Sequence, residues 1–232
     1  MTVAKEFSAQ DAARMIDISA VRSQHGLRDI EEMVAIARQY HFINVHTLPC
    51  WTKTVRAMLE DAPYVFVGAP VGFPAGGHCT NVKLLEARTL IDDGVQEMDI
   101  VMNVGKFLAG EYAYVEDELA AIISLVPGDV TTKVIIELNC LPEEALHKAC
   151  ELVIASGAGY LKTGTGWVPG GANIERIRVI KALTAGRIMV KAAGGIRTRQ
   201  DFDTLRHMGV ERFGINIQSA LSIVRSFGEN AE

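Results

Sequence analysis

Apolar runs of strand length alternate with longer segments of helical period along the chain. In the segment Arg28–Tyr40 the apolar residues follow an i, i+3, i+4, i+7 spacing, which predicts an amphipathic helix. Further helices are predicted at Asn81–Asp92, Tyr112–Leu125, Glu143–Ser156 and Asn173–Leu183. One more is predicted to begin after Thr198, which caps it, and to run through Leu205. Strands are predicted at Met15–Ile18, Phe42–Val45, Tyr64–Gly68, Glu97–Met102, Lys133–Leu138, Gly159–Lys162, Ile188–Val190 and Arg212–Ile215.

Eight β/α units in 232 residues give about 29 residues each, the size of one strand and one crossover helix. The strands read as apolar on both faces, as in a parallel sheet covered by helices. No linker or shift in composition divides the chain, so we expect a single (β/α)8 TIM barrel, an α/β fold, over residues 1–232. A doubly wound open sheet is the alternative. It predicts a glycine-rich turn after the first strand, where Ile16–Ser23 has no glycine.

Composition and charge narrow the classes of partner. With 49% hydrophobic and 22% charged residues, the chain has enough material for a core, which excludes disorder. The net charge is −5 and no basic stripe appears, so we expect no nucleic acid partner. No apolar run approaches the ~18 residues of a membrane helix, and the N-terminus lacks a secretory h-region. We therefore expect a cytoplasmic protein with no membrane partner.

The four cysteines show no C-x-x-C pairing. We expect reduced thiols buried in the core at Cys50, Cys79, Cys140 and Cys150.

Two lysines end neighbouring apolar strands, and in a barrel such strand ends converge on one site. Lys162 ends the run G-A-G-Y-L-K, and Lys191 ends R-I-M-V-K one β/α unit later. Adjacent strands lie ~4.8 Å apart, so the two ammonium groups can approach closely, which lowers the pKa of one of them. A neutral amine near pH 7 can form a Schiff base with a carbonyl. Each lysine taken alone also fits a structural ion pair.

Asp99 is an acid inside the apolar run E-M-D-I-V-M, and a buried aspartate requires partners. The two lysines can supply them, which leaves Asp99 either a proton relay or a charge neutraliser. Glu97 precedes it by two positions and should point to the same side of the strand. The six histidines show no metal-ligand spacing, and only His46, at a strand end, is expected in the pocket.

Glycines cluster after the two lysines and in the last strand. Glycine lets backbone N–H groups approach an anion, and barrels often bind phosphate with the loops after strands 7 and 8. Any one of these glycines also fits a tight turn. The cluster comprises Gly164, Gly166, Gly170, Gly171, Gly194, Gly195 and Gly214.

Taken together, these residues resemble the deoxyribose-phosphate aldolase family over nearly the whole chain. The resemblance implies a class I, metal-free aldolase without a cofactor. It assigns the Schiff base to Lys162, the pKa-lowering partner to Lys191 and the proton relay to Asp99. The matching strings are V-G-F-P-A-G (Val71–Gly76), E-M-D-I-V-M-N-V-G (Glu97–Gly105), K-V-I-I-E (Lys133–Glu137), L-K-T-G-T-G-W (Leu161–Trp167) and V-K-A-A-G-G-I-R-T (Val190–Thr198).

The substrate-recognition positions depart from the family pattern. Gly164 replaces the serine of K-T-S-T-G, and G-I-N-I-Q (Gly214–Gln218) replaces a G-x-S-S-G type loop. His46 stands where the family often has cysteine, D-I-S-A-V-R replaces D-H-T-L-L, and no tyrosine lies near the C-terminus. Positive charge for an anionic substrate could come from Arg22, Lys106 or Arg197. The candidate substrate-binding residues are Asp17, His46, Thr163, Thr165, Gly166, Gly194, Gly195, Gly214 and Asn216.

Three functions follow from this sequence. The first is an aldehyde-lyase that cleaves 2-deoxy-D-ribose 5-phosphate into acetaldehyde and glyceraldehyde 3-phosphate. The second is a related Schiff-base aldolase with a changed acceptor, either non-phosphorylated or bearing another anionic group. The third, a non-catalytic sugar-phosphate sensor, predicts a lost reactive group, and none is lost. The expected partner is a small aldehyde or sugar phosphate, and a homodimer or a homotetramer is compatible with the sequence.

Overall fold

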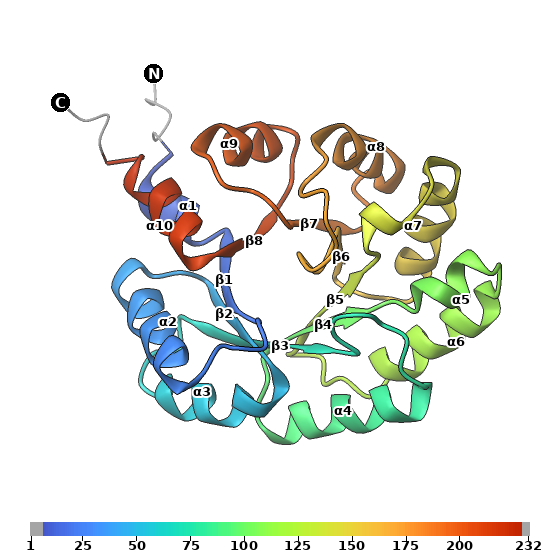
Figure 1. Cartoon of the computed structure of the whole chain (residues 1–232), viewed down its shortest axis with the longest axis horizontal. Helices are drawn as coiled ribbons and strands as arrows, with labels where there is room; N and C mark the ends of the chain where they lie inside the picture. The colour runs from blue at the N-terminus through green and yellow to red at the C-terminus, as the bar shows by residue number, and fades with distance from the viewer. Residues whose placement is uncertain (1–6, 229–232) are drawn as a thin grey trace.

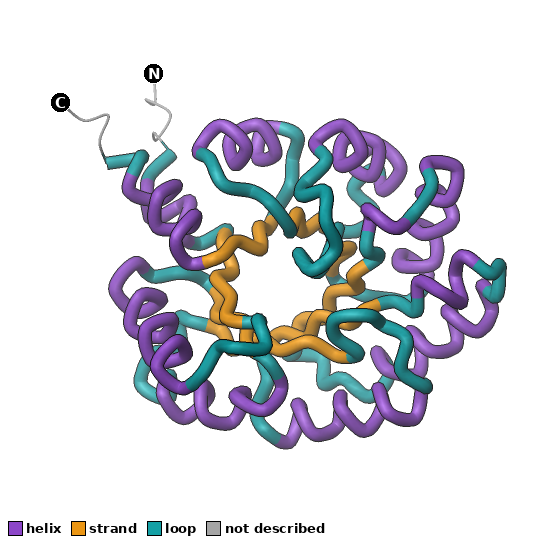
Figure 2. The backbone as a smooth tube through the Cα atoms, viewed as in Figure 1, coloured by secondary structure: helices purple, strands orange, loops and turns teal. Residues whose placement is uncertain are grey.

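The computed structural model describes residues 7–228. The predictions on the export signal and the C-terminal tyrosine rest partly on residues 1–6 and 229–232, outside the described residues. Eight parallel strands pair in chain order, and β1 also pairs with β8, which closes the barrel shown in Figure 2. The strands are β1 (Ile16–Ala20), β2 (Asn44–Thr47), β3 (Phe66–Val71), β4 (Glu97–Val101), β5 (Thr131–Ile135), β6 (Tyr160–Lys162), β7 (Met189–Ala193) and β8 (Arg212–Asn216).

Helices surround the strands as an outer ring (Figure 1). In α2 the predicted apolar stripe is buried against the barrel, because Ile30, Met33, Val34 and Ala37 share one helix face. No helix among residues 7–228 has both the length and the apolar composition to cross a membrane. The α-helices are α1 (Ala9–Ala13), α2 (Leu27–Tyr40), α3 (Thr52–Met58), α4 (Thr80–Asp92), α5 (Val104–Leu108), α6 (Tyr112–Ile123), α7 (Leu146–Ala155), α8 (Ile174–Thr184), α9 (Arg199–His207) and α10 (Ile217–Arg225). The 3-10 turns are η1 (Pro49–Trp51), η2 (Leu138–Cys140) and η3 (Glu143–Ala145).

The predicted elements are all present, with shifted ends. Thr198 caps α9 through its side chain, as predicted, and Asn173 caps α8 in the same way. The helix predicted at Glu143–Ser156 begins instead with the 3-10 turn η3. Four helices were not predicted, namely α1, α3, α5 and α10. Each spans at most nine residues, too few turns to show a clear period.

The inner face of the barrel is charged, which corrects the expectation of strands apolar on both faces. Outward positions such as Ile18 and Val190 are apolar and lie buried beneath the helices. Inward positions carry seven buried ionisable groups from six strands: Asp17, Glu97, Asp99, Lys133, Lys162, Lys191 and Arg212. Closure of the barrel places acids and bases of different strands within ion-pair distance, so these charges compensate one another.

The cysteines are free thiols, but only Cys150 is buried. The expectation that Cys50, Cys79 and Cys140 are core residues was wrong, because all three are exposed. Cys50 and Cys140 lie in the 3-10 turns η1 and η2, and Cys79 immediately precedes α4. These connecting segments run over the surface, where a small apolar side chain is not drawn into the core.

Candidate active site

Lys162 and Lys191 share one carboxylate. They are register partners at the C-terminal part of β6 and β7. Both amines donate to the same oxygen of Asp99, with Nζ–Oδ2 distances of 2.7 Å from Lys162 and 3.0 Å from Lys191. Asp99 comes from β4, on another side of the barrel. The three side chains singled out by the sequence therefore meet at one point.

The other interior charges hold Lys191 more tightly than Lys162. Lys191 Nζ lies 2.5 Å from Asp17 Oδ2 as well as 3.0 Å from Asp99. Lys133 pairs with Glu97 and lies 3.3 Å from Asp99 Oδ1. Lys191 is thus braced by two carboxylates and Lys133 by three, because Asp17 Oδ2 also lies 3.8 Å from Lys133 Nζ. Lys162 has Asp99 as its one ion-pair partner among the described residues.

A charge count explains which amine gives up its proton. The inner face holds three carboxylates, Asp17, Glu97 and Asp99, and four basic groups, Lys133, Lys162, Lys191 and Arg212. Loss of one proton from the basic set balances the two signs in a buried site, where uncompensated charge is costly. Lys162 is the basic group with the fewest partners, so it is the group that loses the proton at least cost.

The pKa values follow this arrangement. Burial, with a further contribution from Lys191, lowers the pKa of Lys162 to about 8, although Asp99 opposes the shift. Roughly one Lys162 in ten is therefore neutral at pH 7. Burial alone would raise the pKa of Asp99, but His46 and the ammonium groups around it hold that pKa well below its usual range. Asp99 therefore remains an anion beside a partly neutral amine.

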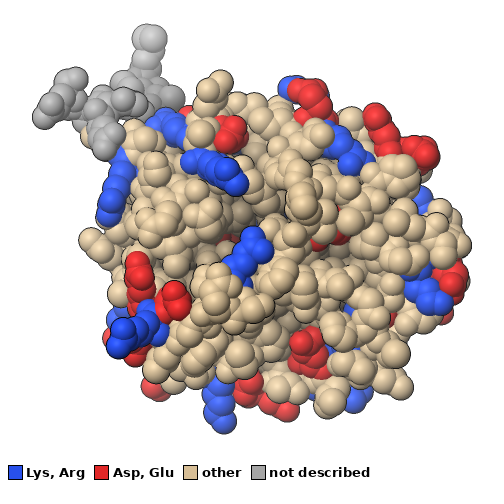
Figure 3. Space-filling model, in the orientation of Figure 1, with Lys and Arg blue, Asp and Glu red and all other residues tan. Residues whose placement is uncertain are grey.

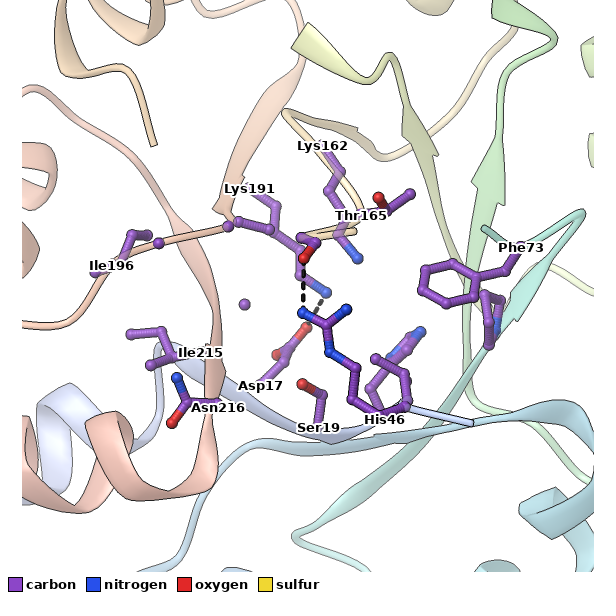
Figure 4. Close-up of a pocket in the computed structure, with 18 of the residues that line it drawn as sticks. Asp17, Ser19, His46, Phe73, Lys162, Thr165, Lys191, Ile196, Ile215 and Asn216 are labelled. Carbon is purple, nitrogen blue, oxygen red and sulfur yellow. Dashed lines mark hydrogen bonds and ion pairs between the residues drawn. The ribbon is translucent and has the colours of Figure 1, made fainter. Parts of the chain in front are cut away.

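A cavity of about 220 Å³ opens above this cluster at the mouth of the barrel. In Figure 4 the side chains of Lys162 and Lys191 point toward its centre, with Asp17 below them and His46 on the opposite wall. Asp99 lies beneath the lining, fully buried. The predicted site residues that line the cavity are Asp17, His46, Lys162, Thr165, Gly166, Lys191, Gly194, Gly195, Gly214 and Asn216.

Thr163 does not line this cavity. Its hydroxyl donates to the carbonyl of Ala193 at 3.2 Å and accepts from the Ala193 N–H at 3.0 Å. As the residue after Lys162, it points to the opposite side of the chain and ties β6 to β7. The structure thus places Thr163 where it positions the two lysine strands.

Arg22 spans the mouth of the cavity. It precedes α2, and its guanidinium donates from Nη2 to the carbonyl oxygen of Gly166 at 2.8 Å. The same guanidinium lies 5.1 Å from the ring centroid of Trp167, which packs edge-on against Phe73 at 5.9 Å. In Figure 3 the charged side chains of the visible face lie mostly around its periphery, and one basic side chain stands near the centre.

The other two basic candidates differ in position. Arg197 lines the cavity beside the loop that contains Gly194 and Gly195. Lys106 is not part of the lining, because its amine pairs with Glu111 at 2.8 Å. Arg22 and Arg197 are therefore the sources of positive charge at the cavity mouth.

The glycine-rich loops after β6 and β7 pack backbone against backbone. Gly195 adopts φ +78°, and a Cβ there would lie 2.6 Å from the Cα of Gly171. Only glycine permits this approach. The loops therefore present main-chain groups of Gly194 and Gly195 to the cavity.

Two departures from the family pattern have a local structural explanation. A Cβ at Gly164 would lie 2.8 Å from Glu137 Oε1, and Glu137 accepts hydrogen bonds from the Thr165 N–H and hydroxyl. Asn216 occupies the start of α10, where its Oδ1 accepts from the Ser219 N–H at 3.0 Å. The N-terminus of α10 is thus capped by the protein's own side chain.

Sequence reasoning missed Arg212 as part of the site. Arg212 bridges Asp17 and Glu97, with N–O distances of 3.0 and 2.7 Å. It also missed Lys133 and the cavity residues Ser19, His25 and Phe73. For Ser19 and Lys133 the available signal was a polar residue two positions from another polar residue of the same strand, Asp17 in β1 and Thr131 in β5, since alternate residues of a strand face the same side.

Curated relatives of this chain are aldolases. A deoxyribose-phosphate aldolase of Klebsiella pneumoniae is 39% identical over 222 residues, 95% of this chain and 89% of that protein. One of Sinorhizobium medicae is 41% identical over 216 residues, 93% of this chain and 87% of that protein. The chain belongs to the deoxyribose-phosphate aldolase family. It is therefore an aldolase, a lyase. A scan of protein-family models found no match.

Solved structures of this family share the fold. An aldolase designated QR15 superposes with a TM-score of 0.88 at 36% identity, covering 94% of this chain and 96% of that one. The deoxyribose phosphate aldolase of Aeropyrum pernix gives a TM-score of 0.87 at 27% identity, covering 95% and 92%. The latter enzyme is described as having a unique tetrameric structure. The barrel expected from the sequence is confirmed.

Proposed function

We propose that this aldolase cleaves and forms a C–C bond through a Schiff base on Lys162, with 2-deoxy-D-ribose 5-phosphate as substrate. The products of cleavage are acetaldehyde and glyceraldehyde 3-phosphate. One observation carries the proposal. Lys162, at the cavity floor, has fewer carboxylate partners than the other buried lysines of the site, and its pKa is lowered to about 8. The names of the relatives support the choice of substrate.

The chemistry starts with attack of neutral Lys162 Nζ on the C1 carbonyl of the open-chain sugar. Loss of water from the carbinolamine gives an iminium ion. Asp99 and Lys191 move the protons, since Asp99 Oδ2 lies 2.7 Å from Lys162 Nζ and 3.0 Å from Lys191 Nζ. Cleavage of the C2–C3 bond sends its electron pair into the iminium and leaves an enamine. The C3 hydroxyl gives its proton to the Asp99–Lys191 pair at the same time, and its O–H electron pair forms the aldehyde C=O of glyceraldehyde 3-phosphate. Protonation of the enamine and hydrolysis of the new iminium release acetaldehyde and free Lys162.

The phosphate end of the substrate is assigned to the cavity mouth. Arg22 and Arg197 supply positive charge there, and the loop of Gly194 and Gly195 supplies main-chain groups. An arginine binds phosphate through a planar fork of donors, which fits a rim position better than a point charge. Lys162 lies at the floor of the same cavity, so one sugar phosphate spans from floor to rim.

A second acceptor class is favoured by a specific observation. An adjoining cavity of about 220 Å³ shares Ser19, His25 and Asn216 with the first and is lined by Asp29 and Glu32. Its carboxylates repel a phosphate group. A non-phosphorylated, hydroxylated aldehyde meets no such repulsion, so it is the second candidate acceptor.

Borohydride reduction in the presence of substrate tests the mechanism. We expect a covalent adduct located on Lys162 by peptide mapping. Lys162→Ala should lose both the adduct and activity, and a chelator should leave activity unchanged. A matched substitution at the exposed Lys148, Lys148→Ala, controls for loss of a lysine. Full activity and trapping in Lys162→Ala would overturn the assignment.

A panel of aldehydes with and without phosphate tests the substrate. A large kcat/KM advantage for deoxyribose 5-phosphate over deoxyribose supports the phosphorylated acceptor. An advantage for free aldehydes shifts the assignment to the second candidate.

A further inference from the structure

Glu137 is a buried carboxylate outside the main cavity. It follows β5, and 6% of its surface is exposed. It lines a small cavity behind the loop between β6 and α8, which shares Gly166 and Gly194 with the main cavity. Among the described residues no cation pairs with it, and a buried charge without an ionic partner needs hydrogen-bond donors.

All of these donors belong to Thr165. The backbone nitrogen of Thr165 lies 3.2 and 3.3 Å from the two carboxylate oxygens of Glu137, and the Thr165 hydroxyl donates to Oε2. The same hydroxyl accepts from the Trp167 N–H at 3.0 Å. A hydroxyl has one proton to donate, so Thr165 lines the cavity but has no proton left for a substrate. Thr165 therefore links Glu137 to the backbone of Trp167.

The backbone of Glu137 is in the left-handed region, with φ +50° and ψ +62°. Residues other than glycine rarely adopt this conformation, and glycine adopts it without steric cost. Glycine would lack the carboxylate that holds Thr165. The turn itself is fixed against β6, because the Leu138 N–H donates to the carbonyl of Thr163 at 2.7 Å. A strained backbone that aims a buried carboxylate at one loop indicates a role for that side chain.

The loop that Glu137 holds is the loop that contacts Arg22. Gly166 accepts from Arg22 Nη2 at 2.8 Å, and the guanidinium lies 5.1 Å from the ring centroid of Trp167. Both contacts are made by the two residues that immediately follow Thr165. Among the described residues, Gly166 takes one of the five N–H donors of the guanidinium, which leaves the others available to an anion.

We propose that Glu137 is a positioning residue for Arg22, acting through Thr165. This inference rests on the proposed function, in which Arg22 binds the substrate phosphate. The carboxylate fixes Thr165, and the next two residues then hold the guanidinium at the cavity mouth before the substrate arrives. Affinity gained in this way comes from preorganisation. Glu137 lies outside the cavity that contains Lys162, so it acts on binding of the phosphate end and not on the bond-making steps.

Glu137→Gln tests the proposal. The amide keeps the shape of the side chain but removes its charge and turns one acceptor oxygen into a donor. We expect KM for deoxyribose 5-phosphate to rise about tenfold, the effect of a weakened charged hydrogen bond. KM for deoxyribose, kcat on both sugars and borohydride trapping on Lys162 should stay within about threefold. Glu143→Gln, in the exposed turn η3, is the matched control.

A double-mutant cycle with Arg22→Ala separates positioning from general loosening of the loop. In the Arg22→Ala background, Glu137→Gln should change KM for deoxyribose 5-phosphate by less than about twofold, because the group that it positions is gone. A full additional rise in that background, or an equal rise for both sugars in Glu137→Gln alone, overturns the proposal.

The same cycle distinguishes failure of this inference from failure of the proposed function. An unchanged KM in Glu137→Gln, with a raised KM in Arg22→Ala, overturns the positioning role alone. An unchanged KM for deoxyribose 5-phosphate in Arg22→Ala overturns the phosphate assignment of the proposed function, and the positioning role with it.

Variants of Thr165 keep the test valid if Glu137→Gln does not fold. Thr165→Val keeps the shape of the side chain but loses the hydroxyl, and it should reproduce the selective rise in KM for the phosphorylated sugar. Thr165→Ser keeps the hydroxyl, so its rise should be at least about threefold smaller than that of Thr165→Val. Equal effects of the two variants, or no rise in Thr165→Val, would show that the Glu137–Thr165 hydrogen bond does not position Arg22.

Discussion

Lys162 and Lys191 face each other across β6 and β7 and donate to the same oxygen of Asp99, but only Lys191 has a second carboxylate, Asp17. This asymmetry divides two chemically identical side chains into two roles. The charge of the braced Lys191 helps to release the proton of Lys162. Burial is the larger cause of the lowered Lys162 pKa, and Lys191 adds to it.

Removal of Lys191 should shift the pH dependence of the reaction. In Lys191→Leu the pKa of Lys162 rises from about 8 toward its ordinary value, because a repelling cation is lost. The acidic limb of the kcat/KM profile then moves to higher pH, and each unit costs about tenfold at pH 7. The loss should be smaller at pH 9. Lys148→Leu, on the exposed face of α7, controls for the loss of a lysine, and an unmoved acidic limb with activity retained would refute the coupling.

Arg212 should contribute strongly to stability. Arg212→Met leaves the buried carboxylates of Asp17 and Glu97 without their bridging partner. We expect a loss of about 3–5 kcal/mol in the free energy of unfolding, measured by urea denaturation. Arg38→Met breaks the exposed Arg38–Asp61 pair and should change stability little. Similar urea midpoints for the two variants would contradict the prediction.

Acid should destabilise the barrel through its interior carboxylates. Burial alone raises the pKa of Asp17, but Lys191, Arg212 and Lys133 outweigh it and hold that pKa below its ordinary 3.8. The unfolded chain therefore binds the proton first, so stability is fully present above about pH 4 and is lost as pH falls below it. Urea unfolding between pH 7 and pH 2 should show this decline. Asp17→Asn should flatten it, and an identical slope in that variant would argue against the assignment.

Arg22 should determine affinity for a phosphorylated substrate. Arg22→Ala removes a guanidinium at the cavity mouth without touching Lys162. We expect KM for deoxyribose 5-phosphate to rise about 10- to 100-fold, the range for a lost charged hydrogen bond, with kcat nearly unchanged. KM for deoxyribose should change little. Arg28→Ala, outside the cavity, is the control, and an equal KM increase for both sugars would show that Arg22 does not bind phosphate.

The sequence by itself determined the barrel and the lysines at its strand ends. The alternation of strand and helix periods is local, so it could be read without contacts between distant residues. The strand ends carrying Lys162 and Lys191 were equally visible, because each lysine ends an apolar run.

The tertiary structure alone decided how these groups act on one another. Arg22 meets Gly166 from 144 positions away, and Asp99 meets Lys191 from 92 positions away. Such contacts depend on the register and closure of all eight strands, which no local pattern encodes. The same closure buries Lys162, and burial lowers its pKa. The sequence shows which ionisable groups are present. Their charge states depend on the distances between them and on the exclusion of water, and both arise only in the folded barrel.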